Sequence, residues 1–302
     1  MIVSNSHPYR KEITYLLSQS MIQMSSAQIQ AWMKTIYDPD NMFCMIQDNR
    51  VAACIQVRHS VLVYQGKKAA ACQILLAAVH PDYRRRKYFS QLLDVVLEQA
   101  QYNELFTICC TDFPKLFTNR GFQPVSHTRT CWTSLEGFSK GEPDNVVPYT
   151  EAIDLYPFYA KFMSYFDGSI LYDRETLQRI LSYYTLNNHK IVVLMDRQDK
   201  VRGYAIYRHA ESTIHIEILM YLNSNALYDL LHYLSKRTRS VSFVITDQER
   251  LEHIVNVDYP REKSTILARI NDPKLFTRWV NKKTNNAQMA YERLKRPDWN
   301  HL

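Results

Sequence analysis

The sequence has little glycine, no long apolar run and no leader-like start. Only six of its 302 residues are glycine, so most turns must be built from residues that carry a side chain. Its longest apolar runs are about ten residues, which is too short to span a bilayer. The first residues lack the apolar core and the small-residue cleavage site of a signal peptide. We therefore expect a cytoplasmic protein with no membrane partner.

Cysteine and histidine patterns typical of disulfide scaffolds and metal sites are also missing. The six cysteines stand in apolar surroundings without the spacing of a disulfide framework or a zinc site, so we expect reduced, buried thiols. Cys109 and Cys110 are adjacent in a strand-like run and could act as nucleophiles. No histidine lies near them in the sequence, which favours inert thiols. The ten histidines show no ligand spacing either, and no metal is expected.

Composition places the chain among ordinary globular proteins. It is 46% hydrophobic and 22% charged, and a length of 302 residues favours two domains. The net charge of +7 favours anionic ligands. These charges are spread along the chain and no RNA-binding motif is present, so no nucleic-acid partner is expected. A nucleic-acid-associated protein is therefore a weaker hypothesis than the transferase and the binding module described below.

The stretch Ala69–Ala100 organises the first half of the chain. Ala69–Val79 is almost uncharged and is followed by Pro81, which predicts a buried strand. Phe89–Ala100 has apolar side chains at helical spacing, which predicts an amphipathic helix. The four cations Arg84–Lys87 are expected to form the first turn of that helix. A helix start offers unpaired N–H groups and a positive dipole end, so this turn is predicted to bind an anion, with a diphosphate favoured over a simple solvated basic loop.

The remaining pattern alternates strands and helices and then repeats. We expect a polar arm, a helix around Ile29–Ile36, strands at 43–46, 51–57, 60–64 and 105–111, a short helix and a strand from Phe122. Strands at 191–195, 201–207, 213–221 and 241–246, with a helix at 225–235, then repeat the arrangement. The predicted class is α/β, of the mixed α+β-sheet kind, with two similar domains each built on a central mixed sheet flanked by helices. The second copy has only Leu222-Asn223-Ser224-Asn225 in place of the basic turn.

The segments VHPDYRRRKYFSQLL and LFTNRGFQPV resemble the GCN5-related N-acetyltransferases (GNAT). The tandem copy without the first motif, followed by ILARINDPKLF, is similar to the enhanced-intracellular-survival branch. The resemblance implies a GNAT domain over 1–135 with an acetyl-CoA site. It implies a second GNAT-like domain without the phosphate turn over 136–265, and a tail over 266–302 like the start of a sterol-carrier domain. A duplicated fold with an apolar tail is compatible with a homo-oligomer.

The resemblance also implies an activity. It is CoA-dependent N-acyl transfer, with acetyl-CoA as the substrate that donates the acyl group and a primary amine of a small molecule or peptide as acceptor. The acceptor pocket is expected between the domains, bordered by the aromatic segment at 156–173. The residues that would bind the donor belong to the buried strand, the basic turn and the end of the next strand: Ala77, Ala78, Val79, Arg84, Arg85, Arg86, Lys87, Tyr88, Phe89, Ser90, Thr111 and Asp112.

Three departures from the family pattern leave the catalytic residues unassigned. Lys87 stands where the family has glycine, and Phe117 occupies the position of the tyrosine that acts as general acid. The strand Ala69–Val79 contains no carboxylate. The long-tailed branch is thought to use its terminal carboxylate, a role that would fall to Leu302. These departures support an alternative function, a catalytically weakened GNAT-fold module that binds CoA, another ligand or a protein.

Overall fold

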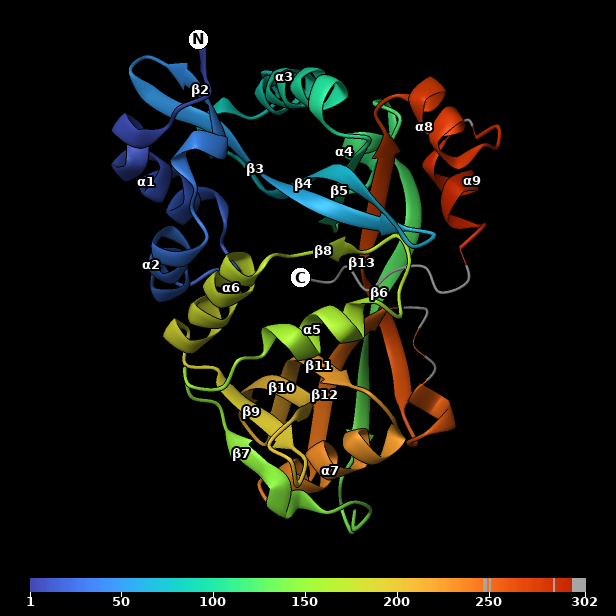
Figure 1. The fold of residues 1–302 in the computed structure, drawn as a ribbon. Coiled ribbons are helices and arrows are strands. Elements are labelled where there is room, and N and C mark those ends of the chain that lie inside the picture. The colour runs from blue at the N-terminus through green and yellow to red at the C-terminus, as the bar shows by residue number, and fades with distance from the viewer. Residues whose placement is uncertain (247–248, 250, 285, 295–302) are drawn as a thin grey trace.

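The computed structural model describes residues 1–246, 249, 251–284 and 286–294. Their strands form one continuous sheet in the order β1-β2-β3-β4-β5-β13-β6-β12-β11-β10-β9-β7, with β8 pairing β3 (Figure 1). The strands of the first half are β1 Ile2–Val3, β2 Met42–Gln47, β3 Arg50–Tyr64, β4 Lys67–Val79, β5 Phe106–Thr111 and β6 Gln123–Ser134. Those of the second half are β7 Val146–Pro148, β8 Ile170–Leu171, β9 Lys190–Met195, β10 Val201–Ala210, β11 Thr213–Tyr221, β12 Ser240–Thr246 and β13 Asp258–Ile270.

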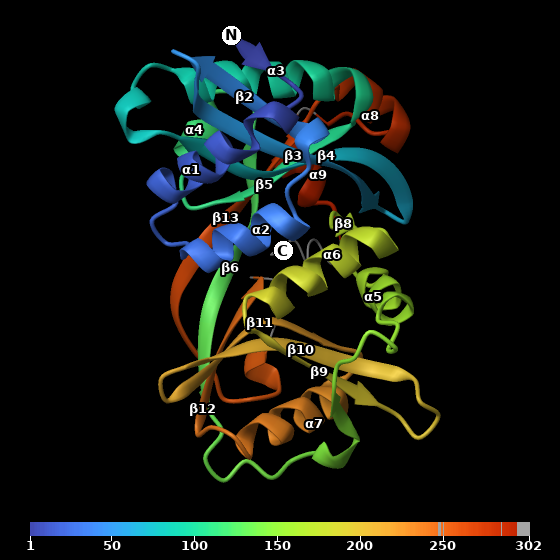
Figure 2. The ribbon, with the colours of Figure 1, turned by 90° about the vertical axis from the view of Figure 1, so that its left-hand side faces the viewer.

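Helices cover both faces of the first half of this sheet. The helices of the described residues, in both halves, are α1 Arg10–Ser20, α2 Ser26–Thr35, α3 Tyr88–Asn103, α4 Lys115–Thr118, α5 Tyr156–Met163, α6 Arg174–Leu186, α7 Ser224–Ser235, α8 Pro273–Val280 and α9 Ala287–Tyr291. The apolar face of α3 packs on one side of β2–β5, and α1 and α2 pack on the other. Helices α5 and α6 lie between the two halves of the molecule (Figure 2). The mixed α/β class expected from the sequence is confirmed.

The second half repeats the order of the first. Strands β9, β10 and β11, helix α7 and strand β12 follow one another as β2, β3, β4, α3 and β5 do. In both copies the strands on either side of the helix pair in parallel, whereas the preceding hairpins are antiparallel. The internal duplication read from the sequence is therefore present in the fold.

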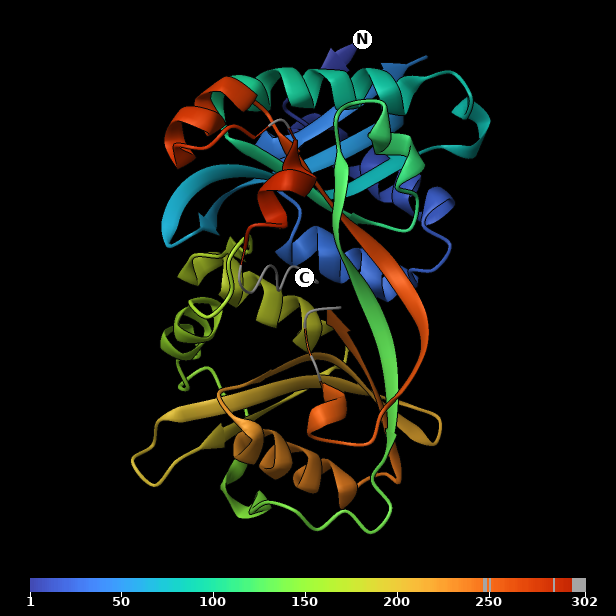
Figure 3. The same ribbon diagram turned by 90° about the vertical axis from the view of Figure 1, so that its right-hand side faces the viewer.

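Strand β13 joins the two halves. It is inserted between β5 and β6 and is antiparallel to both, and β6 pairs in turn with β12 of the second copy (Figure 3). The first-half sheet is thus completed by a strand that follows the second copy in the sequence. The domain limit expected after residue 135 falls just beyond the end of β6, and the limit expected after residue 265 falls inside β13.

Two local expectations differ from the structure. The segment Ser60–Tyr64 is the end of β3, which runs from Arg50 as one strand. The pairing of β3 with β4 shifts register between Gln56 and Val57. A single shift of this kind bends a strand without ending it. The polar arm contains α1, whose Ile13, Leu16 and Leu17 are fully buried at helical spacing.

Candidate active site

Strands β4 and β5 pair over a short length and then separate. Their parallel ladder runs from Ala71 opposite Phe106 to Ile74 opposite Cys109. The next residue, Leu75, is the extra residue of the bulge that β4 forms against β3. Beyond this point a cavity of about 830 Å³ lies between the two strands. The divergence of two central strands therefore creates the candidate site.

The cavity reaches both faces of the sheet. Ala77 and Val79 pack in the cluster beneath α3, whereas Leu76 and Ala78 pack in the cluster beneath α1 and α2. Because successive side chains of a strand point to opposite faces, the end of β4 lines the cavity from both sides. Lining residues come from the α3 face, such as Ser90, and from the segment between α1 and α2 on the other.

The basic turn precedes α3 and is not its first turn, which corrects the expectation from the sequence. The helix begins at Tyr88, with Lys87 as its N-cap. Arg84 is extended with ψ 157°, and both Arg85 (φ 65°) and Lys87 (φ 63°) adopt the left-handed conformation. That conformation costs a residue with a side chain on the order of 1–2 kcal/mol. Lys87 thus adopts a backbone conformation that glycine would adopt without this cost.

The N-terminus of α3 has no cap from its own side chains. Lys87 makes no side-chain cap hydrogen bond, and the first turn contains no acidic residue. The first N–H groups of a helix have no partner within it, so these amides are available to an anion. In the second copy, the side chain of Asn223 accepts a hydrogen bond from the N–H of Ala226 at 2.9 Å and caps α7. Only the first copy therefore combines an uncapped helix with a basic turn in the described residues.

The structure brings together eleven of the twelve residues expected to bind the donor. They line the cavity from three places. Ala77, Ala78 and Val79 are on β4, and Thr111 and Asp112 are at the end of β5. The third place is the basic turn with the start of α3, which supplies Arg84, Arg85, Lys87, Tyr88, Phe89 and Ser90. Arg86 does not line it. Its guanidinium lies over the ring of Tyr83, 5.2 Å from the ring centre. In the turn, neighbouring residues point in different directions, which a count of cations cannot show.

Phe117 contributes packing at the floor of the cavity. Its ring makes edge-to-face contacts with Phe89 and Phe122, each with ring centres 5.4 Å apart, and the residue is buried. Phenylalanine has no proton to donate. Phe117 is among the residues that line the cavity.

Asp112 is the carboxylate that lines the cavity within the described part of the chain. One of its carboxylate oxygens accepts a hydrogen bond from the hydroxyl of Ser264 on β13 at 2.6 Å. Thus the inserted strand also orients a side chain at the site. The carboxylate of Leu302, the other candidate, lies outside the described residues.

Sequence reasoning missed two groups of lining residues. One is the segment between α1 and α2, Ser20, Met21, Ile22 and Gln23, and the other is Phe113 with Leu116 after β5. Ile22, Phe113 and Leu116 are among the exposed large apolar side chains of the molecule. The only signal in the sequence was the presence of apolar residues in otherwise polar loops. That these loops meet at one cavity depends on the pairing of the sheet, which the sequence does not show.

The two adjacent cysteines differ. Both line the cavity, but Cys109 is buried, and burial raises its pKa well above the usual value, whereas Cys110 is exposed. The expectation of buried thiols therefore fails for Cys110. It holds for Cys44, Cys54, Cys72 and Cys131, which are buried, and burial raises the pKa of Cys44 to about 12.

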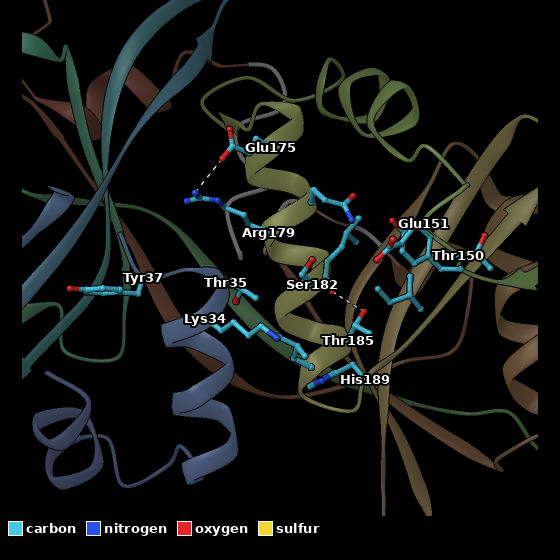
Figure 4. A pocket seen from close by; sticks show the side chains of 15 residues that line it. Lys34, Thr35, Tyr37, Thr150, Glu151, Glu175, Arg179, Ser182, Thr185 and His189 are labelled. Atoms are coloured by element: carbon cyan, nitrogen blue, oxygen red, sulfur yellow. Dashed lines mark hydrogen bonds and ion pairs between the residues drawn. The ribbon is translucent and has the colours of Figure 1, made fainter. Parts of the chain in front are cut away.

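A second large cavity, of about 770 Å³, lies between α2 and α6 and shares no lining residue with the first (Figure 4). Among its polar residues are Glu151, Arg179 and Glu175, the last two joined in an ion pair with 3.2 Å between their charged atoms. The aromatic segment at 156–173, expected to border the acceptor pocket, lines neither large cavity. Phe158 and Phe162 pack in the core.

The corresponding position in the second copy holds an ion cluster. Glu217 follows the last β11 residue that pairs with β12. Burial alone would raise its pKa, but the imidazoles of His189 and His215, each with a ring nitrogen 3.6 Å from the carboxylate, and the guanidinium of Arg208 hold the pKa well below its usual range. The Glu217 carboxylate is 3.2 Å from the Arg208 side chain. This half thus uses its diverging strands to bury a charge network.

Comparison with known proteins agrees with this geometry. Two family models described as acetyltransferase (GNAT) domains match residues 9–123 and 172–270. Together they match well over half of the chain, which belongs to the GNAT acetyltransferase family as a tandem-domain protein. No curated protein sequence matches it.

Solved structures with the same fold include three bacterial proteins. The GCN5-related N-acetyltransferase from Anabaena variabilis is 13% identical with a TM-score of 0.77, and the alignment covers 90% of this chain and 73% of that one. Eis1 from Mycobacterium abscessus is 13% identical with a TM-score of 0.67, with coverage of 90% and 74%. The GCN5-related N-acetyltransferase from Kribbella flavida is 13% identical with a TM-score of 0.68, with coverage of 90% and 72%. At these identities the likeness concerns the tandem fold.

The described residues contain neither a membrane-spanning helix nor a metal-binding group. No helix there has the length and apolar character needed to cross a lipid bilayer. No group of three or more histidine, cysteine, aspartate or glutamate side chains in that part of the chain is arranged to hold a metal ion.

Lys87→Gly should stabilise the protein, since glycine adopts the left-handed conformation without the steric cost that Lys87 bears. Glycine also makes the unfolded chain more flexible, which offsets part of this stabilisation. We therefore expect the free energy of unfolding to rise by about 0.5–1 kcal/mol. The midpoint of thermal unfolding would measure it. Lys68→Gly, in the strand β4 where no left-handed conformation occurs, is the control and should destabilise. A lower midpoint for Lys87→Gly would contradict the strained turn.

Alkylation should modify one cysteine much faster than the others. At pH 8 the thiolate is the reactive form, and the raised pKa of the buried thiols keeps it scarce. Iodoacetamide followed by peptide mass spectrometry should find Cys110 labelled first, and Cys110→Ser should remove the fast phase. Rapid labelling of Cys109 would show that this end of β5 is not packed as described.

Proposed function

We propose that the chain is a CoA-dependent N-acyltransferase. It would transfer an acyl group, acetyl in the simplest case, from acyl-CoA to a primary amine by direct attack. The observation that carries this proposal is the cavity between the diverging strands β4 and β5, which ends against the uncapped helix α3. Its volume of about 830 Å³ is within the range of cofactor pockets.

The donor would lie along β4 with its diphosphate at the basic turn. The amides of Tyr88, Phe89 and Ser90, at the start of α3, would hold the phosphates, with Arg85 and Lys87 adding charge. The pantetheine arm would pass between the strands, beside Ala77, Ala78 and Val79 on one wall and Thr111 on the other. Such a ligand extends a sheet that has been opened at this point, so main-chain groups can bind it.

The reaction needs few protein groups. The neutral amine forms a C–N bond with the thioester carbonyl carbon, and the C–S bond then breaks. A main-chain N–H of the 77–79 segment would stabilise the negative oxygen between these steps. The amine loses one proton and the departing thiolate gains one. Phe117 cannot supply that proton, so we assign it packing only. The proposal includes a cytoplasmic location, consistent with six cysteines that form no disulfide.

A second candidate is a GNAT-fold protein that binds CoA with little turnover. Phe117 lacks the proton-donating hydroxyl, and this observation favours the second candidate. Release of free thiol from acetyl-CoA with a panel of amines separates the two functions. The transferase releases thiol in proportion to acylated amine, whereas the binding module shows heat of binding in calorimetry without release.

Arg85→Ala should weaken acetyl-CoA binding by about tenfold, the usual size for loss of one charge-assisted phosphate contact. Arg85 lines the cavity. The matched control is Lys68→Ala, since Lys68 is an exposed cation at the start of β4 and does not line the cavity. Isothermal titration gives both affinities. Equal affinities for Arg85→Ala and the unchanged protein would argue against phosphate binding at the turn.

Phe117→Tyr should raise turnover by about tenfold or more, because general-acid catalysis typically contributes on the order of 10²–10⁴. The tyrosine hydroxyl would be placed at the cavity floor, where the Phe117 ring stands. Stopped or continuous thiol assays under saturating acetyl-CoA would measure kcat. Phe122→Tyr, at a fully buried neighbouring ring, is the control for a hydroxyl added nearby. An unchanged kcat for Phe117→Tyr would remove position 117 from the mechanism.

A further inference from the structure

The second copy has a small cavity where its two central strands separate. Strands β11 and β12 pair in parallel from Ile214 to Ile216 and then diverge, as β4 and β5 do after Ile74. A cavity of about 300 Å³ lies at the ends of these strands. The described residues that line it are Tyr221 and Leu222 at the end of β11, Glu249 beyond β12, and Phe162, Tyr165 and Phe166 at the end of α5. We call this cavity the aromatic pocket.

The walls of the aromatic pocket are mostly ring surfaces. Four of the six lining residues are aromatic, and three of these come from α5 or the turn after it, which lies against β10 and β11 (Figure 1). Phe162 is buried, whereas Tyr165 is 45% exposed, so the pocket extends from the core to the surface. The rings of Phe162 and Phe166 have centres 5.2 Å apart and planes inclined at 44°, so neither lies flat on the other.

The backbone that carries these rings is held by the last turn of α5. The main-chain N–H of Tyr165 donates to the carbonyl of Phe162, and that of Phe166 donates to the carbonyl of Met163, both at 3.1 Å. Tyr221 is fixed from the other side, because it pairs with Gly203 in the ladder between β10 and β11. The rings are therefore placed by regular structure on both sides of the pocket.

The charge of the lining is negative. Glu249 is its charged residue, and no lysine or arginine lines the pocket within the described part of the chain. The main-chain N–H of Glu249 donates to the carbonyl of Thr246 at 3.2 Å, and its carboxylate accepts from the N–H of Thr246 at 3.3 Å. This turn holds the carboxylate at the end of β12. The pocket therefore favours a cation, whereas the basic turn of the first copy favours an anion.

The chemistry of the lining also selects the kind of cation. The face of an aromatic ring carries negative potential and attracts a cation placed over it. A primary ammonium has three N–H donors and is strongly hydrated, so a lining made mainly of ring carbon compensates it poorly. A trimethylammonium group has no N–H, and its methyl groups pack on rings. The volume of about 300 Å³, against about 830 Å³ in the first copy, suits such a group and not a nucleotide.

We propose that the second copy binds a trimethylammonium group in the aromatic pocket. The four rings surround its methyl groups, and the carboxylate of Glu249 balances its charge. Free molecules such as choline carry this group, and so do trimethylated lysine side chains of proteins. The exposed edge at Tyr165 admits both. This binding does not require acyl transfer in the first copy, so the two proposals stand or fall separately.

The first experiment uses the full chain and two molecules of the same shape. Isothermal titration compares choline with 3,3-dimethyl-1-butanol, in which an uncharged carbon replaces the ammonium nitrogen. We expect choline to bind about tenfold more tightly or better. In NMR, saturation of the aromatic ring protons of the protein should transfer to the methyl signal of choline, which contact with a carboxylate alone would not produce. Equal affinities, or no transfer to the methyl signal, would overturn the proposal.

Variants locate the binding. Tyr165→Ala removes a partly exposed ring and Glu249→Gln removes the charge while keeping the shape, and each should weaken choline binding several-fold. Tyr102→Ala is the matched control for the ring, since Tyr102 is 83% exposed on α3, and Glu252→Gln is the control for the charge. Neither residue lines the pocket, and neither variant should change the affinity. Unchanged affinity in both pocket variants would place choline elsewhere and contradict the proposal.

Two further titrations separate the source of the group and the site. A peptide with trimethylated lysine is compared with choline and with the unmodified peptide. Tighter binding of choline assigns the pocket to a free molecule, and tighter binding of the trimethylated peptide assigns it to a protein side chain. If the unmodified peptide binds as tightly as both, the pocket does not recognise methylation and the proposal fails. Acetyl-CoA should leave the choline affinity unchanged, because the two cavities share no lining residue. Competition would place choline in the first copy and overturn the assignment.

Discussion

The separation of β4 from β5 after four paired residues is the feature on which the site depends. Parallel strands normally satisfy each other's main-chain groups along their length, so their divergence leaves donors and acceptors facing a cavity. The bulge at Leu75 bends β4 at that point. The loop after β4 then reverses direction and presents the start of α3 to the same space. One interrupted ladder thus accounts for both the cavity and the uncapped helix end that faces it.

In the second half of the chain, two strands diverge in the same way, but the basic turn and the uncapped helix are missing. Its strands β11 and β12 separate after three paired residues. Asn223 caps the following helix, and the carboxylate of Glu217 is surrounded by His189, His215 and Arg208. A half-buried carboxylate with several partners takes the place of the anion site of the first copy. The two copies share a fold, and the chemistry of a few residues at one strand end distinguishes them.

Much of this could be predicted from the sequence, because the signals were local. Periodicity located α3 and the strands around it. The resemblance to the GNAT family implied the twelve donor-binding residues, of which eleven lie together in one cavity. The turn itself was predicted less well, since the left-handed conformations of Arg85 and Lys87 give no sign in a run of cations. The Ser20–Gln23 lining and the hydrogen bond from Ser264 to Asp112 depend on pairings between distant segments, which no local pattern records.

The placement of β13 has a consequence for how this protein is made. Residues near the end of the chain complete the sheet that residues near its beginning start, so β5 has no partner on that side until Thr265–Ile270 has been synthesised. A nascent first half would therefore expose an open strand edge for most of translation. The half that contains the candidate site cannot complete its sheet ahead of its duplicate, and each molecule in which that sheet is complete has already been translated past both copies.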